Sequence, residues 1–104
     1  MYLREITEGL ISLNRAAESV ISLHQGVADN KKNIDLLYQL AENEQLRWLL
    51  TQFWQENRNE RAYIKTKAIV RAEKYKQALD IMEYWRKMRQ LQDQTARNIQ
   101  SAGL

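Results

Sequence analysis

The chain contains no proline and only three glycines among its 104 residues. Strand-rich folds need turn residues at every hairpin, and such residues are nearly absent here. Hydrophobic residues make up 44 % of the chain, which is enough for a folded core, and the commonest residues are mostly compatible with helices. We therefore predict an all-α fold, and the length predicts one domain that covers residues 1–104.

The first predicted helix covers residues 2–27. Apolar residues recur there at alternating spacings of three and four, which is typical of a helix that packs along one side. These positions are Leu3, Ile6, Leu10, Leu13, Ala17, Val20, His24 and Val27. Gly26 can end this helix and Asp29 or Asn30 can cap the next, so we expect a turn that folds the second helix back antiparallel to the first. Gly9 either costs about 1 kcal/mol relative to alanine or marks a close approach between helices.

The second predicted helix covers residues 31–56. A polar stretch at residues 42–45 interrupts its apolar pattern, and Asn43 within that stretch could cap a separate helix. Because no glycine or proline intervenes, we favour one continuous or kinked helix over two shorter ones. The polar residues 55–59 include Asn57 and Asn59 and predict the second turn of the chain.

The third predicted helix covers residues 59–100 and carries two apolar stripes. One stripe consists of Ile64, Ala68, Ala72, Tyr75, Leu79 and Met82, and the second consists of Ile81, Trp85, Met88, Thr95 and Ile99, with Tyr84 and Leu91 beside it. Such a helix would be about 60 Å long at ~1.5 Å per residue, which is more than the other two helices can cover. Its distal end should therefore project or pair with its copy. We predict a small antiparallel bundle of three helices, or four if Asn43 begins a new one, that forms a homodimer.

Charge is distributed unevenly along the chain. Residues 1–57 hold five basic and eight acidic residues, whereas residues 58–104 hold eleven basic and five acidic ones. Either the acidic half packs against the basic half, or the basic half binds an acidic protein or a phosphate backbone. A helix with aligned cations can follow phosphates, so nucleic-acid binding is the alternative function. The predicted basic face consists of Arg58, Arg61, Lys65, Lys76, Arg86, Lys87 and Arg97.

The sequence offers little for catalysis. There is no cysteine, which excludes disulfides, thiolate chemistry and cysteine-bound zinc. His24 is the only histidine, and it lies on the heptad pattern, where we interpret it as a residue of the core edge or of an interface. No paired carboxylates and no glycine-rich phosphate loop occur. We therefore expect no enzyme activity, no metal, no cofactor and no small-molecule substrate.

No apolar run approaches the ~20 residues that span a bilayer. We therefore expect no membrane partner, and a cytoplasmic location is the expectation from the acidic N-terminal region. The predicted function is that of a non-enzymatic helical protein–protein interaction module, such as an adaptor, chaperone, inhibitor or assembly factor. Aromatic residues dominate binding hot spots, which favours an interaction surface made of Trp54, Tyr84, Trp85, Met88 and Leu91.

Overall fold

The computed structural model describes residues 2–27, 29–60 and 66–101, with side chains from residue 8 onward. Within these ranges the chain forms four α-helices and no strand, which confirms the prediction of an all-α fold. The helices are α1 (Tyr2–His24), α2 (Asn30–Glu42), α3 (Glu44–Glu60) and α4 (Thr66–Ser101). None of the helices in the described part of the chain combines the length and the apolar character that crossing a membrane requires.

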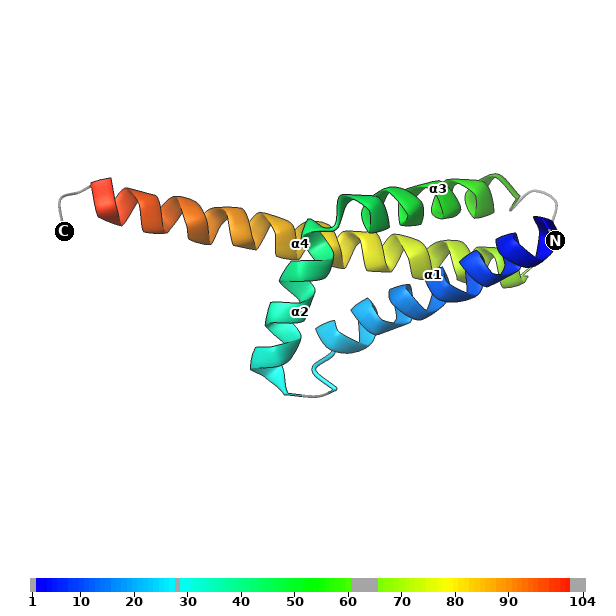
Figure 1. Cartoon of the computed structure of the whole chain (residues 1–104), viewed down its shortest axis with the longest axis horizontal. Coiled ribbons are helices and arrows are strands. Elements are labelled where there is room, and N and C mark those ends of the chain that lie inside the picture. The colour runs from blue at the N-terminus through cyan, green and yellow to red at the C-terminus, as the bar shows by residue number, and fades with distance from the viewer. Residues whose placement is uncertain (1, 28, 61–65, 102–104) are drawn as a thin grey trace.

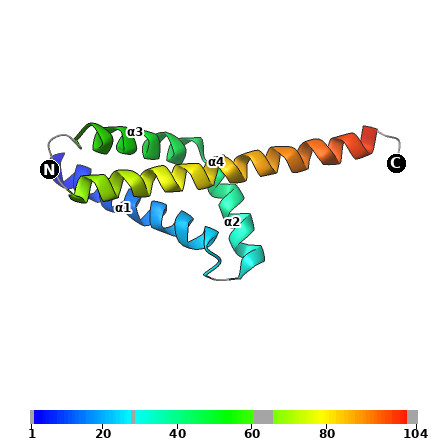
Figure 2. The same cartoon turned by 180° about the vertical axis from the view of Figure 1, so that it is seen from behind.

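The long helix α4 determines the shape of the molecule, which measures 59 × 27 × 27 Å. Helix α3 runs antiparallel to the first half of α4, and α1 lies along another side of the same half (Figure 1). Seen from behind, the first half of α4 lies between α3 and α1 (Figure 2). Helix α2 crosses the long axis of the molecule and contacts α4 near its middle. The second half of α4 extends beyond the other three helices.

The turn between α1 and α2 uses the residues that the sequence predicted. Gly26 has a φ of 73°, a left-handed conformation that glycine adopts without a steric penalty. The carboxylate of Asp29 caps α2 by accepting hydrogen bonds from the backbone N–H groups of Lys31 and Lys32, at 3.0 and 3.2 Å. However, α1 ends at His24 rather than at residue 27. Helix α2 also leaves the turn across the molecule and does not follow α1 back along its length (Figure 1).

The preference for one continuous helix over residues 31–56 is wrong, because Asn43 separates two helices. Its backbone is extended, with φ −78° and ψ 94°, which ends the helical hydrogen bonding of α2. Its side-chain oxygen accepts a hydrogen bond from the backbone N–H of Leu46 at 3.0 Å and so begins α3. Arg47 donates to the carbonyl of Ala41 and stabilises the end of α2. One polar residue therefore does here what a glycine or proline usually does: it ends one helix and lets the chain change direction.

The second predicted turn, at residues 55–59, is also wrong, because α3 continues through it to Glu60. Asn57 is only 4 % exposed. Its amide nitrogen donates to the carbonyl of Phe53 at 2.7 Å, and its side-chain oxygen accepts from Arg71 of α4 at 3.4 Å. Because these bonds satisfy the side chain, Asn57 is compatible with a helix that packs on α4. The connection between α3 and α4 lies outside the described residues.

The core lies around the first half of α4 and draws on all four helices. Its buried residues are Leu13, Ala17 and Val20 of α1, Leu37 and Ala41 of α2, Leu50 of α3, and Tyr75, Ala78, Leu79, Ile81 and Met82 of α4. Tyr75 is fully buried, and its hydroxyl donates to the side-chain oxygen of Asn14 at 2.7 Å. Burial raises the pKa of the Tyr75 phenol, because the phenolate would lose its hydration. This residue therefore joins α4 to α1 by both packing and a hydrogen bond.

Gly9 does not mark a close approach between helices. It is exposed, and a Cβ atom added there would meet no atom of the described structure within 4 Å beyond its immediate surroundings in α1. The remaining alternative is that Gly9 lowers the stability of α1 relative to alanine at this position.

Candidate functional site

The apolar face of α4 changes sides along the helix. In the first half, one side is buried against the other helices and includes Ala68, Ala72, Tyr75, Leu79 and Met82. At ~100° per residue, the same side continues with charged residues in the second half. These residues are Arg86, Arg89, Asp93 and Arg97. The side that packs the core therefore becomes a solvated, charged side once α4 leaves the body of the molecule.

The apolar residues of the second half lie on nearly the opposite side of α4. This set, which we call the distal stripe, consists of Tyr84, Met88, Leu91, Thr95 and Ile99. Tyr84, Leu91 and Ile99 are 52 %, 56 % and 53 % exposed, and Met88 is half-buried. All described residues from Arg89 onward are exposed, so within one chain the distal end of this helix projects from the body. No described segment of the chain covers the distal stripe.

Trp85 lies where α1, α2 and α4 meet, at the base of the projecting end. Its indole N–H donates to Nδ1 of His24 at 3.2 Å. Its ring contacts the ring of Tyr38 edge to face, with the two centroids 5.5 Å apart. The guanidinium of Arg89 lies over the Tyr38 ring, 5.1 Å from its centroid. Trp85 was predicted to contact a partner; within one chain, its contacts join α4 to α1 and α2. His24 is exposed at the end of α1, where its Nδ1 accepts this bond.

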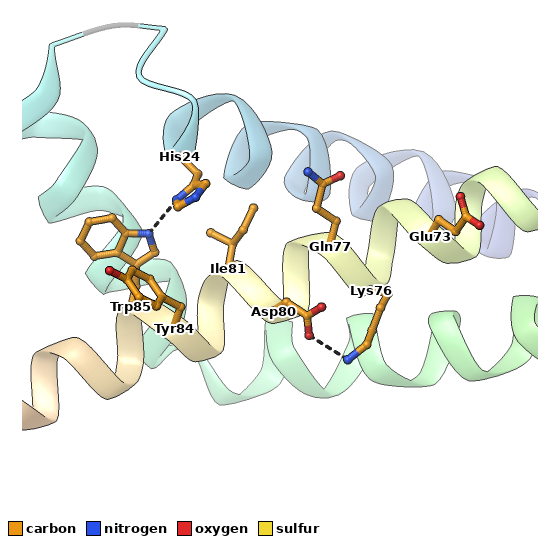
Figure 3. Close-up of a pocket in the computed structure, with 8 residues that line it drawn as sticks. All are labelled: His24, Glu73, Lys76, Gln77, Asp80, Ile81, Tyr84 and Trp85. Atoms are coloured by element: carbon orange, nitrogen blue, oxygen red, sulfur yellow. Dashed lines mark hydrogen bonds and ion pairs between the residues drawn. The ribbon is translucent and has the colours of Figure 1, made fainter.

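A cavity of about 720 Å³ lies beside Trp85, between the end of α1 and the outer side of α4 (Figure 3). We call it the α4 groove, and it is lined by His24, Glu73, Lys76, Gln77, Asp80, Ile81, Tyr84 and Trp85. Lys76 and Asp80 form an ion pair of 2.8 Å at its edge. Gln77, Ile81 and Tyr84 follow one another on the same side of α4 as the distal stripe. The groove and the stripe therefore form one continuous surface.

The predicted basic face is divided between two helices. Arg58 belongs to α3, whereas Lys76, Arg86, Lys87 and Arg97 belong to α4. The other two predicted members, Arg61 and Lys65, lie outside the described residues. The prediction placed Arg58 on the same helix as the others and is wrong on this point, because α3 extends to Glu60 and so includes Arg58.

Several of these cations contact groups of their own chain. Arg58 and Lys76 both approach the ring of Trp54, with 5.5 and 5.4 Å between the cation and the ring centroid. Arg86 pairs with Glu83 at 3.7 Å, and Arg97 donates to the carbonyl of Asp93 at 3.4 Å. Trp54 is half-buried and packs partly on the core. These contacts reduce the charge that the basic face offers to an external partner.

One ion pair joins the acidic α1 to the basic α4. The ammonium of Lys74 lies 2.8 Å from a carboxylate oxygen of Glu18. The hydrogen bond from Lys74, together with its positive charge, lowers the pKa of the Glu18 carboxyl. This pair is the kind of contact expected if the acidic half of the chain packs against the basic half.

A second groove, which no sequence pattern indicated, lies between α1 and α3. Its cavity of about 610 Å³ is lined by Gly9, Ser12, Leu13, Ala16, Leu46, Leu49 and Phe53. Trp48 of α3 is 60 % exposed and was also not among the predicted interaction residues. The α4 groove was missed for the same reason as this one: both depend on how separate helices meet. The sequence signals near the α4 groove were the heptad position of His24 and the predicted interaction residues Tyr84 and Trp85.

Within the described residues, no three histidine, cysteine, aspartate or glutamate side chains lie close enough to hold a metal ion. Among the described residues, Glu18 and Tyr75 have a pKa that departs clearly from its ordinary value, and they are a surface ion-pair partner and a core residue. Neither lines the α4 groove.

Comparisons with protein-family models, with curated proteins and with solved structures found no match for this chain. Its function must therefore be inferred from its own residues and their arrangement.

Proposed function

We propose that the protein is a non-enzymatic protein–protein interaction module that binds a helix of its partner along the distal stripe of α4. The observation that supports this proposal most strongly is the change of sides of the apolar face. Ala72 and Met82 lie on the main core side of α4, which continues into charged residues. Leu91 and Ile99 lie on the opposite side, in line with the buried Ile81. Such a stripe fits a helix that is not part of the same packed body.

The composition of the distal stripe also fits this role, and so does the end of α4 that carries it. Tyr84 and Leu91 are large apolar residues that are more than half exposed, and large apolar residues are rarely exposed together in a row without a binding role. The helix beyond Arg89 makes no core contact among the described residues, and isolated helices of about 12 residues are only marginally stable in water. A bound helix would both cover the stripe and stabilise this end. An adaptor or assembly factor would use such a surface directly.

The proposal can be tested with two matched variants of the full chain. Leu91→Glu places a charge in the centre of the distal stripe, whereas Gln90→Glu places the same charge on the neighbouring residue, which faces away from the stripe. Both positions are exposed, so helicity should be unchanged in both variants. Tagged chains expressed in the native host should keep their bound proteins with Gln90→Glu and lose them with Leu91→Glu. Identical sets of bound proteins, second copies included, would refute the proposal.

Nucleic-acid binding is the alternative proposal, and the cluster of cations at Trp54 favours it. Arg58 and Lys76 both approach the half-buried ring of Trp54, at 5.5 and 5.4 Å from its centroid, an arrangement that can bind both a phosphate and a base. In this case the affinity for single-stranded DNA or RNA should fall steeply with salt, and Lys76→Glu combined with Arg86→Glu should abolish it. The absence of binding at low salt would remove this alternative.

A further inference from the structure

The surface formed by the distal stripe and the α4 groove has a spacing that is complementary to itself. Its positions follow the alternating steps of four and three that characterise a coiled-coil seam. They are Gln77, Ile81, Tyr84, Met88, Leu91, Thr95 and Asn98, with Ile99 beside the last. The seam alternates between the a and d positions of the heptad. In an antiparallel coiled coil, each a position of one helix faces a d position of the other, so one stripe can pair with a reversed copy of itself. A single helix face then supplies both sides of the interface, as in other two-fold symmetric dimers.

We propose that the partner of this surface is a second copy of the chain, bound antiparallel about a two-fold axis that passes between Met88 and Leu91. This inference rests on the proposed function, because it names the helix that the distal stripe binds. The register places Met88 against Leu91 of the second copy and Tyr84 against Thr95 of the second copy. It also brings Ile99 of each copy to Ile81 of the other.

The α4 groove supports this register, because it lies where the end of the second copy arrives. Tyr84, which is 52 % exposed, lines the groove and belongs to the seam. Ile81, at the next seam position, also lines the groove but is only 8 % exposed. The groove has a volume of about 720 Å³, and Ile99 is a 53 % exposed apolar side chain in the structure of one copy. The antiparallel register inserts Ile99 into this apolar space. A parallel register would leave the groove open and would place Ile99 against itself at the tip.

The distribution of charge also favours a second copy over an acidic partner. Arg86, Arg89 and Arg97 lie on the side of α4 away from the seam, and two of them pair with acidic side chains of the same helix. Lys87 is the cation nearest the stripe, and the register places it beside Gln94 of the second copy. Two copies therefore meet without like charges facing one another. An acidic partner on this stripe would find few cations at its border.

The first test is the mass of the full chain in solution. Sedimentation equilibrium should give twice the 12.4 kDa of one chain. Leu91→Glu should raise the dissociation constant by about 30-fold or more, as expected for a central hot-spot residue, and Gln90→Glu should leave it within about three-fold of the parent. Circular dichroism of both variants checks that they remain helical. A monomer at high concentration, or a Leu91→Glu variant that still forms the dimer, would overturn the inference.

The second test determines the direction of the two helices. Because the natural chain has no cysteine, single cysteines can be introduced without a background reaction. Tyr84→Cys and Thr95→Cys chains carrying tags of different length are mixed and oxidised. The antiparallel register predicts disulfides mainly between the two variants, whereas a parallel dimer would give only disulfides within each variant and would overturn the register. Met88→Cys and Leu91→Cys provide a second pair with the same prediction.

These outcomes separate the inference from the proposed function. If the chain is monomeric but the Leu91→Glu variant loses another bound protein in the native host, the proposal of a second copy as partner fails. The proposal of an interaction module then still holds. If Leu91→Glu changes neither self-association nor any bound protein, both proposals fail.

Discussion

The hydrogen bond between Tyr75 and Asn14 offers a direct test of how α4 is held to α1. Tyr75 is fully buried, and its hydroxyl lies 2.7 Å from the Asn14 side-chain oxygen. Tyr75→Phe keeps the ring, which packs edge to face on Phe53 at 6.2 Å between centroids, and removes only the hydroxyl. Asn14 is half-buried and can still reach water. We therefore expect the free energy of unfolding to fall by about 1 kcal/mol, as for a neutral hydrogen bond whose remaining partner is not fully desolvated.

A double-mutant cycle isolates this bond from other effects. Asn14→Ala alone also improves the helix propensity of α1 by up to about 0.7 kcal/mol, which would hide part of the loss. The propensity change is present in both Asn14→Ala and the double variant with Tyr75→Phe, so it cancels in the coupling energy. We expect a coupling of about 1 kcal/mol between the two residues.

The assay is urea unfolding followed by far-ultraviolet circular dichroism, with all variants at the same protein concentration. Equal concentrations are needed because self-association would add a concentration-dependent stability. A loss of 1 kcal/mol should also lower the melting temperature by about 4–8 °C for a chain of this size. Tyr84→Phe serves as the control, since Tyr84 is 52 % exposed, and should change the free energy of unfolding by less than about 0.5 kcal/mol. A coupling energy of zero would refute the reasoning.

Three further predictions concern the turns and the surface. Gly26→Ala should lower the free energy of unfolding by about 1 kcal/mol or more, because Gly26 has a φ of 73°. Gly9→Ala should raise it by up to about 1 kcal/mol in the same urea titration. A change of the same sign in both variants would contradict this pair of predictions. Asn43→Ala should lower it by about 1 kcal/mol through loss of the α3 cap, and Asn43→Asp, which keeps an acceptor, should preserve most of it. Lys74 holds the pKa of Glu18 below its ordinary value of 4.5, so the pair stabilises the fold above that pH and ceases to do so as the pH falls through the lowered pKa. Glu18→Gln should therefore be less stable than the parent at neutral pH and equal to it in acid; a difference that is constant with pH would show that the ion pair is not its cause.

The sequence predicted the parts of the fold that depend on local chemistry. The turn at Gly26 and Asp29 was found because glycine and a capping carboxylate each have a specific role at a helix end. The break at Asn43 was recognised only as an alternative, because the same residue type is tolerated inside helices. Asn57 illustrates this ambiguity: it lies within α3, where Arg71 from another helix satisfies its side chain. Whether an asparagine caps or continues a helix depends here on a contact that the sequence does not reveal.

The candidate site was predicted in part. The two apolar stripes of α4 and the residues Tyr84, Met88 and Leu91 followed from helical spacing alone. The role of Trp85 did not, because its bond to His24 and its contact with Tyr38 join three helices. The α4 groove depends in the same way on where α1 ends beside α4. The basic face was divided because the boundary between α3 and α4 decides which cations share a helix.

The continuity of α4 has a mechanical consequence. Its 36 residues contain neither glycine nor proline, so the helix has no built-in hinge between the core and the tip. It therefore behaves as a lever, one arm of which is held among α1, α2 and α3. Ile99 lies about 21 Å along the axis from Trp85, so a rotation of about 5° at the junction would displace the tip by about 2 Å. Small repacking around Met82 or Tyr38 would then change the direction in which the distal stripe points, without altering any residue of the stripe itself.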